Sequence, residues 1–271
     1  MSYSLAALFG LVQGLTEFLP VSSSGHLAIL SMLSLSADGA VFTLLLHLAT
    51  FAAVCVAFKD DIFKLIRELF CYIPDRIRHR ESPNPDTRRM LEMAVISLLP
   101  LIIVLPIKDT VEAAFSSPIA IGVALAVTSV LLILADRFGN GDKTAGGITV
   151  RDALVIGIFQ LFAVLPGLSR SGATITAALL CGLSRDTAVK YSFIISLPTI
   201  LAAVLLDLPD IISTVSGEAL LPMLLGFAVA AVSGYFAIGL VKLISGKRKF
   251  WIFSVYTAAL SAGLIISQIV A

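Results

Sequence analysis

The chain is poor in charged residues. Only 14% of its 271 residues are Asp, Glu, Lys or Arg, whereas an ordinary soluble domain has about 25%. A soluble fold of this length needs a charged shell, but here most charges gather in a few connecting stretches. Because 58% of the residues are hydrophobic, the composition excludes an ordinary soluble domain and indicates an integral membrane protein.

Other absences exclude further classes of protein. The net charge is only +1 and no basic face stands out, which argues against a nucleic-acid partner. The three cysteines, Cys55, Cys71 and Cys181, have no CxxC spacing, so we expect buried free thiols and not a disulfide or metal role. No basic residue precedes Lys59, so we expect the apolar start to be mature structure and not a signal peptide.

The sequence does contain apolar runs of membrane-spanning length. A bilayer core about 30 Å thick needs roughly 20 helical residues. Such runs lie at about 40–58, 90–107, 118–136, 187–206, 219–241 and 251–270. The stretch 59–89 instead has apolar residues at helical spacing among charges, which predicts an amphipathic helix on the cytoplasmic face and then a surface loop that carries His79.

The distribution of basic residues predicts the topology. Of the 19 Lys and Arg residues, 17 lie in the connections 59–89, 137–151, 185–190 and 242–249, so these connections are expected to be cytoplasmic. The loops 108–117 and 207–218 are then expected outside. This alternation requires that residues 4–35 enter and leave on the outer side and that residues 152–184 enter and leave on the inner side.

Both of these segments are interrupted near the middle. The first break reads Leu-Pro-Val-Ser-Ser-Ser-Gly-His over 19–26, and the second reads Leu-Pro-Gly-Leu-Ser-Arg-Ser-Gly over 165–172. A shift of 147 residues places one segment on the other and matches Gly10 with Gly157, Gln13 with Gln160, Ser22 with Ser169, Ser24 with Ser171 and Gly25 with Gly172. The two segments are therefore interpreted as copies of one repeat that start on opposite sides of the membrane.

These patterns predict one all-α integral membrane domain over 1–271. It should contain an inverted-topology repeat, with copies at about 1–136 and 148–271, about six full transmembrane helices and two broken re-entrant helix pairs. Irregular backbone survives at membrane depth only where protein or a water-filled cavity satisfies it, so the breaks are expected to meet near the midplane. Helix N-termini there would attract an anion, and the serines would cap the second half-helices.

Two ionisable residues adjoin the breaks and carry the strongest functional signal. Glu17 lies one helical turn after Gln13, and a carboxylate at membrane depth costs about 2.5–3.5 kcal/mol on translocon scales. Arg170 lies in the second break, where its planar guanidinium suits phosphate oxygens. The alternative is a purely structural pairing of Glu17 and Arg170, and the two interpretations are compatible.

The histidines differ in their surroundings. His26 directly follows Ser22, Ser23 and Ser24, so it is a candidate general acid or base, and one of the serines is a candidate nucleophile. His47 lies inside the apolar run 40–58 and is interpreted as a structural or hydrogen-bonded core histidine.

This set of residues favours phosphate-ester or diphosphate chemistry on a lipid substrate. A divalent cation, Mg²⁺ or Ca²⁺, held by Glu17 with help from Gln13 would bridge diphosphate oxygens. A secondary transporter or flippase of a lipid phosphate is the competing hypothesis, because inverted repeats with broken helices are common in transporters.

The motifs over Gln13 to His26 and Pro166 to Thr174 closely resemble those of the undecaprenyl-diphosphate phosphatases, the bacitracin-resistance proteins, and the resemblance extends over essentially the whole chain. It implies removal of a phosphate from the C55 polyprenyl diphosphate on the outer face of the cytoplasmic membrane. The position of Gln13 is often Glu in that family, so the metal role shifts mainly to Glu17.

The resemblance and the residues together give the expected site. Attack by Ser23 on the terminal phosphorus is expected, with His26 managing the proton, Glu17 holding the metal and Arg170 neutralising charge, and a metal-bound water is the alternative nucleophile. The substrate-binding residues are expected to be Ser22, Ser24, Gly25, Ser169, Ser171, Gly172 and Thr174. Expected partners are the isoprenyl diphosphate lipid, the bilayer and a second copy in a homodimer.

Overall fold

The computed structural model describes residues 1–33, 40–77, 80–206 and 220–270. In these ranges the regular structure is helical, and Lys143 and Leu183 form an isolated β-bridge. The helices are α1 Tyr3–Phe18, α2 Ser23–Met32, α3 Ala40–Ala57, α4 Lys59–Ile77, α5 Pro85–Leu98, α6 Lys108–Ala114, α7 Pro118–Phe138, α8 Val150–Phe162, α9 Arg170–Leu180, α10 Arg185–Leu206, α12 Leu220–Gly246 and α13 Trp251–Val270, with 3₁₀ helices η1 Leu99–Ile107 and η2 Ala145–Gly147. The prediction of an all-α chain is confirmed, whereas the loop 207–218 and His79 lie outside the described residues.

Fewer uninterrupted spans are present than the six expected. In the described part of the chain, α7, α10, α12 and α13 are each long and apolar enough to cross a membrane, and α3 with α4 forms a fifth candidate that bends by 91°. The expected span 90–107 is divided between α5 and the 3₁₀ helix η1, which contains Pro100 and Pro106. Proline has no N–H to donate to the preceding turn, so a regular α-helix does not continue through this run.

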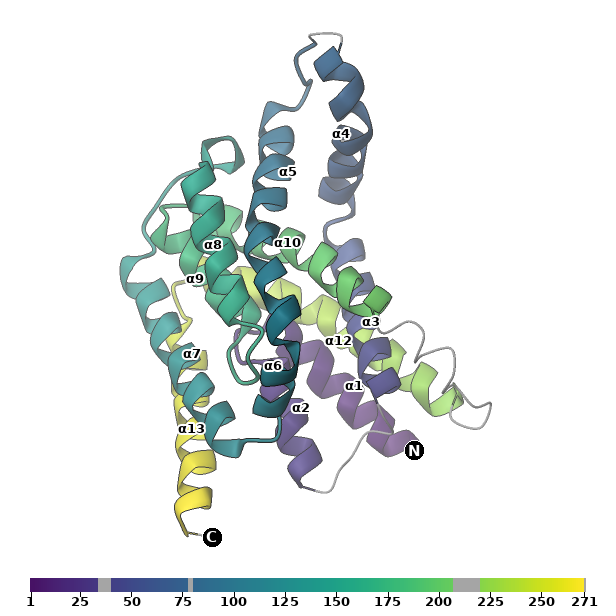
Figure 1. Ribbon diagram of the computed structural model, residues 1–271, viewed down its shortest axis with the longest axis vertical. Helices are drawn as coiled ribbons and strands as arrows, with labels where there is room; N and C mark the ends of the chain where they lie inside the picture. Colours follow the sequence, from purple (N-terminus) through teal and green to yellow (C-terminus); the bar gives the residue numbers. More distant parts are fainter. Residues whose placement is uncertain (34–39, 78–79, 207–219, 271) are drawn as a thin grey trace.

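The broken segment of each half packs on helices of the other half. Helix α1 lies along α12, whereas α8 packs on α5 and η1, and α9 packs on α7 (Figure 1). The last helix, α13, in turn lies along α7. Since α1, α8 and α9 each pack against helices of the opposite half, both hydrophobic clusters of the core contain residues of the two halves. The inverted relation between the two copies stays a prediction.

Both breaks end in the same capping arrangement. Ser22 precedes α2, and its hydroxyl accepts a hydrogen bond from Gly25 N at 3.2 Å. Ser169 precedes α9, and its hydroxyl accepts from Gly172 N at 3.1 Å. A side-chain oxygen at this position satisfies one of the free amides of a first helical turn. The expected capping role of the serines is confirmed, and the remaining first-turn amides of α2 and α9 form two anion-attracting ends.

The two breaks lie against each other. A Cβ atom at Gly25 would lie only 3.0 Å from Gly167 Cα, and one at Gly172 would lie 3.3 Å from Pro20 Cβ. Both distances are tighter than an ordinary van der Waals contact, so glycine on α2 and α9 favours this close approach of the breaks. The role of Gly25 and Gly172 is therefore to let the half-helices meet.

Gly167 provides a test of this packing. Its φ of +92° disfavours any L side chain, and a Cβ atom there would lie 2.5 Å from Ile121 O on α7. We expect Gly167→Ala to lower the free energy of unfolding by about 1–3 kcal/mol, measured by denaturation in detergent. Gly239→Ala on α12 is the matched control, because nothing lies within 4 Å of its added methyl group. Equal stability of the two variants would contradict the packing described here.

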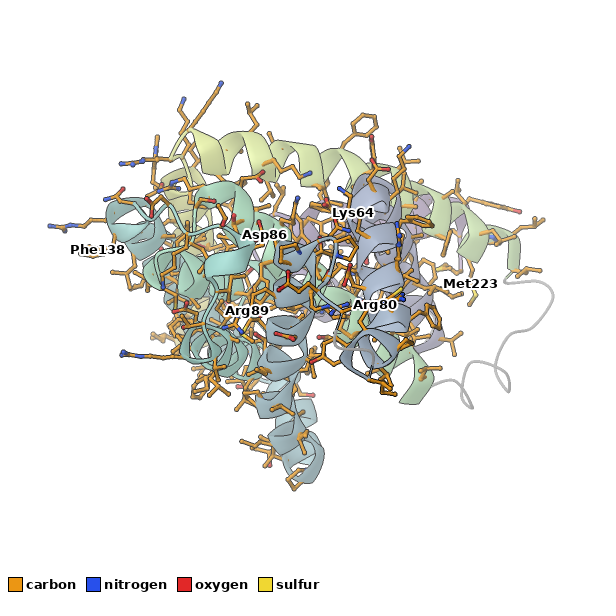
Figure 2. All side chains as sticks on the ribbon, turned by 90° about the horizontal axis from the view of Figure 1, so that it is seen from above. Lys64, Arg80, Asp86, Arg89, Phe138 and Met223 are labelled. Carbon is orange, nitrogen blue, oxygen red and sulfur yellow. The ribbon has the colours of Figure 1, made fainter. Side chains whose placement is uncertain are left out.

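Helices α4 and α5 form a hairpin that extends beyond the rest of the molecule (Figure 1). Glu68 of α4 is buried and accepts hydrogen bonds from Arg88 Nε at 3.0 Å and Ser82 Oγ at 2.8 Å. Charged side chains surround the hairpin, including Lys64 on α4 and Arg89 on α5 (Figure 2). A helix begins at Lys59 as predicted, and its amphipathic role on the cytoplasmic face stays a prediction.

Candidate active site

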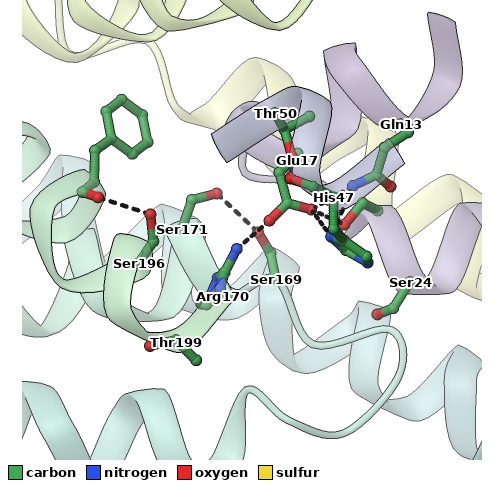
Figure 3. Close-up of polar contacts among 12 residues, drawn as sticks. Gln13, Glu17, Ser24, His47, Thr50, Ser169, Arg170, Ser171, Ser196 and Thr199 are labelled. Atoms are coloured by element: carbon green, nitrogen blue, oxygen red, sulfur yellow. Dashed lines mark hydrogen bonds and ion pairs between the residues drawn. The ribbon is translucent and has the colours of Figure 1, made fainter. Parts of the chain in front are cut away.

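Glu17 is the centre of a polar cluster between the two breaks. Its carboxylate is only 3% exposed, near the end of α1, and its Oε1 pairs with Arg170 Nη2 at the start of α9. Its Oε2 accepts a hydrogen bond from Gln13 Nε2 at 3.0 Å (Figure 3). The same oxygen accepts a hydrogen bond from Ser23 Oγ at 2.6 Å. The structure thus brings the acid, the hydroxyl and the guanidinium together, although 153 residues separate Glu17 from Arg170.

This cluster forms one wall of a cavity of about 310 Å³. We call it the site cavity; its lining includes Glu17, Ser22, Ser23, Ser24, His47, Gln160, Ser169, Arg170 and Thr199. The guanidinium side chain of Arg170 is 21% exposed, so it is paired with Glu17 and also accessible. A hydroxyl bonded to a carboxylate beside a guanidinium can perform nucleophilic attack on a phosphorus atom and stabilise the charge that develops.

A second hollow adjoins the site cavity. It has a volume of about 750 Å³, and we call it the apolar groove; its lining includes Phe9, Leu27, Met32, Leu44 and Pro118. The groove and the site cavity share Ser24, His47, Phe115 and Ala203. A ligand with a polar head and a long apolar tail therefore has adjoining places for both parts.

Comparison with known proteins agrees with this geometry. The family model described as "Bacitracin resistance protein BacA" matches residues 6–263. The chain belongs to this family. The BacA match includes both breaks, the Glu17 cluster and all helices that line the site cavity.

Several curated relatives of this chain have the same name. A protein of Methanococcus vannielii named "Undecaprenyl-diphosphatase" is 39% identical over 255 residues, which cover 93% of this chain and 96% of the relative. Proteins with the same name from Alkaliphilus metalliredigens and Carboxydothermus hydrogenoformans are each 37% identical, over 96% and 97% of this chain and 97% and 96% of the relatives.

His47 is the residue whose position was not foreseen. It was expected to be a structural or hydrogen-bonded core histidine. It is hydrogen-bonded, but its side chain is 29% exposed and lines both the site cavity and the apolar groove. Its Nδ1 lies 3.0 Å from Gln13 Nε2 and 3.7 Å from Glu17 Oε2. The only sequence signal was an ionisable group inside an apolar run, because its neighbours in space come from α1 and not from α3.

His26 does not join the cluster. Its Nδ1 donates to Ser22 O at 2.7 Å, and its Nε2 accepts from the Tyr256 hydroxyl of α13 at 2.7 Å. The ring also stacks on the ring of Tyr256, with centroids 5.6 Å apart. His26 is not among the residues that line the site cavity, so this geometry offers its ring no direct contact with a bound phosphate. Its expected role as general acid or base stays a prediction.

The contact with Ser22 suggests how His26 supports the site. Ser22 has a φ of 71°, unusual for a residue with a side chain, and the hydrogen bond from His26 holds its carbonyl. We expect His26→Ala to lower kcat at least about tenfold by displacing the neighbouring Ser23. His26→Asn should retain more of the activity, since its amide N–H replaces Nδ1–H. A turnover assay in detergent measures the activity of both variants. If His26→Asn is as inactive as His26→Ala, the acid-base role is favoured instead.

The other expected substrate-binding residues divide into two groups. Ser22, Ser24 and Ser169 line the site cavity. Ser171 and Thr174 do not, and they are only 6% and 1% exposed. The Thr174 hydroxyl bonds to Arg170 O at 2.8 Å and to Ser192 Oγ at 2.6 Å, so it fixes the first turn of α9 against α10. Gly25 and Gly172 serve the contact between the breaks.

The oxygen atoms at Gln13 and Glu17 can supply some of the ligands of one hard cation. Gln13 is fully buried, and its Oε1 has no hydrogen-bond partner within the described residues. This oxygen and the Glu17 carboxylate are ligand types that Mg²⁺ and Ca²⁺ prefer, but no group of three or more His, Cys, Asp or Glu side chains that could hold a metal occurs in the described ranges. An ion here must take its remaining ligands from water and the bound phosphates.

Proposed function

We propose that this protein is a membrane-embedded phosphatase that removes the terminal phosphate of undecaprenyl diphosphate and yields the monophosphate carrier lipid used in cell-wall synthesis. The observation that carries the proposal is the hydrogen bond from Ser23 to Glu17 beside Arg170, in a cavity that adjoins an apolar groove. The names of the curated relatives support the same substrate.

The first step is attack by Ser23 on the terminal phosphorus. Glu17 Oε2 lies 2.6 Å from the Ser23 oxygen and accepts its proton as the new P–O bond forms. The bond from the bridging oxygen to the terminal phosphorus breaks, and prenyl monophosphate leaves with the electron pair. Water then hydrolyses the phosphoserine and releases orthophosphate. Direct attack by water is the alternative.

Arg170 and the two half-helices stabilise the negative charge. The pair with Glu17 uses Nη2 of Arg170, so the rest of the planar guanidinium can bind the phosphate oxygens. The N-termini of α2 and α9 add the positive ends of two helix dipoles. The substrate brings several negative charges to this place, which offsets the cost of keeping an arginine at membrane depth.

We propose that a divalent cation, Mg²⁺ or Ca²⁺, binds with the substrate through Gln13 Oε1 and Glu17. Such an ion, when bound, neutralises the charge of the diphosphate. The unpartnered buried oxygen of Gln13 supports this site. Gln13 also orients the Glu17 carboxylate, because its amide N–H donates a 3.0 Å hydrogen bond to Oε2.

The prenyl tail is proposed to follow the apolar groove to the lipid, which the sequence alone could not locate. We further propose that the protein is a multi-pass protein of the cell membrane with the inverted repeat, the six-span topology and the midplane site expected from the sequence. The basic connections, which we expect on the cytoplasmic side, support a site that opens to the outer face. The expected homodimer also remains a proposal.

Phosphate release from C55 diphosphate by the purified protein tests the activity and the cation together. We expect release that EDTA reduces at least about tenfold and that added Mg²⁺ or Ca²⁺ restores. Glu17→Gln is the matched control, because it keeps the shape but should remain inactive with the ion present. Undiminished phosphate release in EDTA would contradict the proposed cation but not the phosphatase activity. No release under any divalent-metal condition would contradict the phosphatase and favour the transporter.

A further inference from the structure

The amide of Gln13 has only one possible orientation. Its nitrogen lies 3.0 Å from Glu17 Oε2 and 3.0 Å from His47 Nδ1. Exchanging the amide oxygen and nitrogen would place two oxygens in contact, one of them on a carboxylate. Both N–H bonds of Gln13 are therefore used as donors, one to Glu17 and one to His47.

This arrangement fixes the tautomer of His47. Because Nδ1 accepts a hydrogen bond from Gln13, the proton of the ring is on Nε2. Within the described ranges no hydrogen bond reaches Nε2. The ring lies between Glu17 and Ser24 (Figure 3), and its side chain is 29% exposed at the boundary of the site cavity and the apolar groove. His47 thus presents an oriented N–H donor without a partner.

The position of this donor matches one part of the substrate. In a prenyl diphosphate the order is tail, inner phosphate and terminal phosphate. With the tail in the apolar groove and the terminal phosphate at Ser23 and Arg170, the inner phosphate lies where the groove and the cavity meet. The polar residues shared by the two are Ser24 and His47.

We propose that His47 Nε2–H binds the inner phosphate of the lipid diphosphate and that Gln13 holds the ring in this tautomer. The proposal rests on the phosphatase function given above. As the bond between the bridging oxygen and the terminal phosphorus breaks, its electron pair moves to the inner phosphate. The hydrogen bond from Nε2 stabilises this growing charge without transfer of the proton. His47 is therefore a catalytic residue on the leaving-group side, opposite the attacking hydroxyl of Ser23.

Two ligands separate this role from general damage to the site. Prenyl monophosphate carries the leaving phosphate, whereas orthovanadate mimics the transferred one. We expect His47→Leu to lower kcat/KM for prenyl diphosphate and to weaken binding of prenyl monophosphate, each at least about tenfold. Inhibition by orthovanadate should change less than about threefold. His47→Gln should recover most of both losses, because its amide nitrogen can reach the place of Nε2.

The control is Thr50→Val on the same helix. Thr50 is buried, and its hydroxyl donates only to His47 O among the bonds described, so this variant should behave like the wild type and show that α3 tolerates substitution. The proposal would be overturned if His47→Leu weakened the binding of prenyl monophosphate and of orthovanadate equally. It would also be overturned if His47→Leu bound prenyl monophosphate as well as the wild type does. If His47→Leu does not yield a monodisperse protein, His47→Phe is measured in the same way. A wild-type protein that binds prenyl monophosphate but releases no phosphate would instead overturn the proposed function.

Discussion

Replacing Ser23 by alanine is expected to lower kcat by on the order of 10⁴-fold or more, the size of effect seen when a nucleophilic serine is removed from a hydrolase. The hydroxyl of Ser23 donates to Glu17 Oε2 at 2.6 Å and lines the site cavity at the first position of α2. Alanine keeps the helix and removes only the attacking oxygen, so the stability in detergent should change little. Phosphate release from C55 diphosphate is the measurement.

A trapping experiment completes this test. Acid quenching of the wild type during turnover of substrate labelled in the terminal phosphate should leave label on Ser23, and Ser23→Ala should carry none. Ser23→Cys is the matched variant, since it retains a nucleophile at the same place. Near-normal turnover by Ser23→Ala, combined with loss of turnover by Arg170→Ala, would show that water attacks directly and that the covalent mechanism is wrong.

Replacing Arg170 by alanine should reduce both activity and stability. The guanidinium is the only cation paired with Glu17 Oε1 among the described residues, and the carboxylate is 3% exposed. Breaking a buried ion pair by removing one partner typically costs about 3–5 kcal/mol. Loss of the phosphate contact should lower kcat/KM at least about 10³-fold. Thermal unfolding in detergent and phosphate release measure the two effects.

A double variant separates the two roles of Arg170. Combining Arg170→Ala with Glu17→Gln removes the uncompensated charge, so we expect most of the stability to return while the activity stays absent. Arg170→Lys provides the second control. It keeps a positive charge for Glu17 but loses the planar fork, and should therefore be stable and weakly active. Full activity of Arg170→Lys would show that the guanidinium supplies only charge.

Local parts of the site could be predicted because they depend on residues close in sequence. Gln13 and Glu17 are four residues apart on one helix, and their expected place on one face of it is confirmed by the 3.0 Å hydrogen bond between them. The capping roles of Ser22 and Ser169 follow equally from their places before α2 and α9. The cost of an ionisable group in an apolar segment also made Glu17 a candidate partner of Arg170, and the structure confirms that pair.

The partners of the two histidines could not be predicted by the same reasoning. His26 is three residues from Ser23 in sequence, yet its ring bonds to Tyr256, 230 residues away. His47 is 30 residues from Glu17, yet its Nδ1 lies 3.7 Å from the carboxylate. The local sequence predicts which residues share a helix. The partners of a side chain, however, depend on the helices that pack beside it.

By itself, the sequence determined the membrane class, the two broken segments and the chemical identity of the site, because composition, spacing and helix ends are local properties of the chain. Only the tertiary structure decided which groups meet. The packing of α1 and α3 on the same helix, α12, and against each other places His47 beside Gln13, and the glycine contacts between the breaks bring Arg170 to Glu17. These contacts depend on close packing between distant segments, which no local pattern specifies.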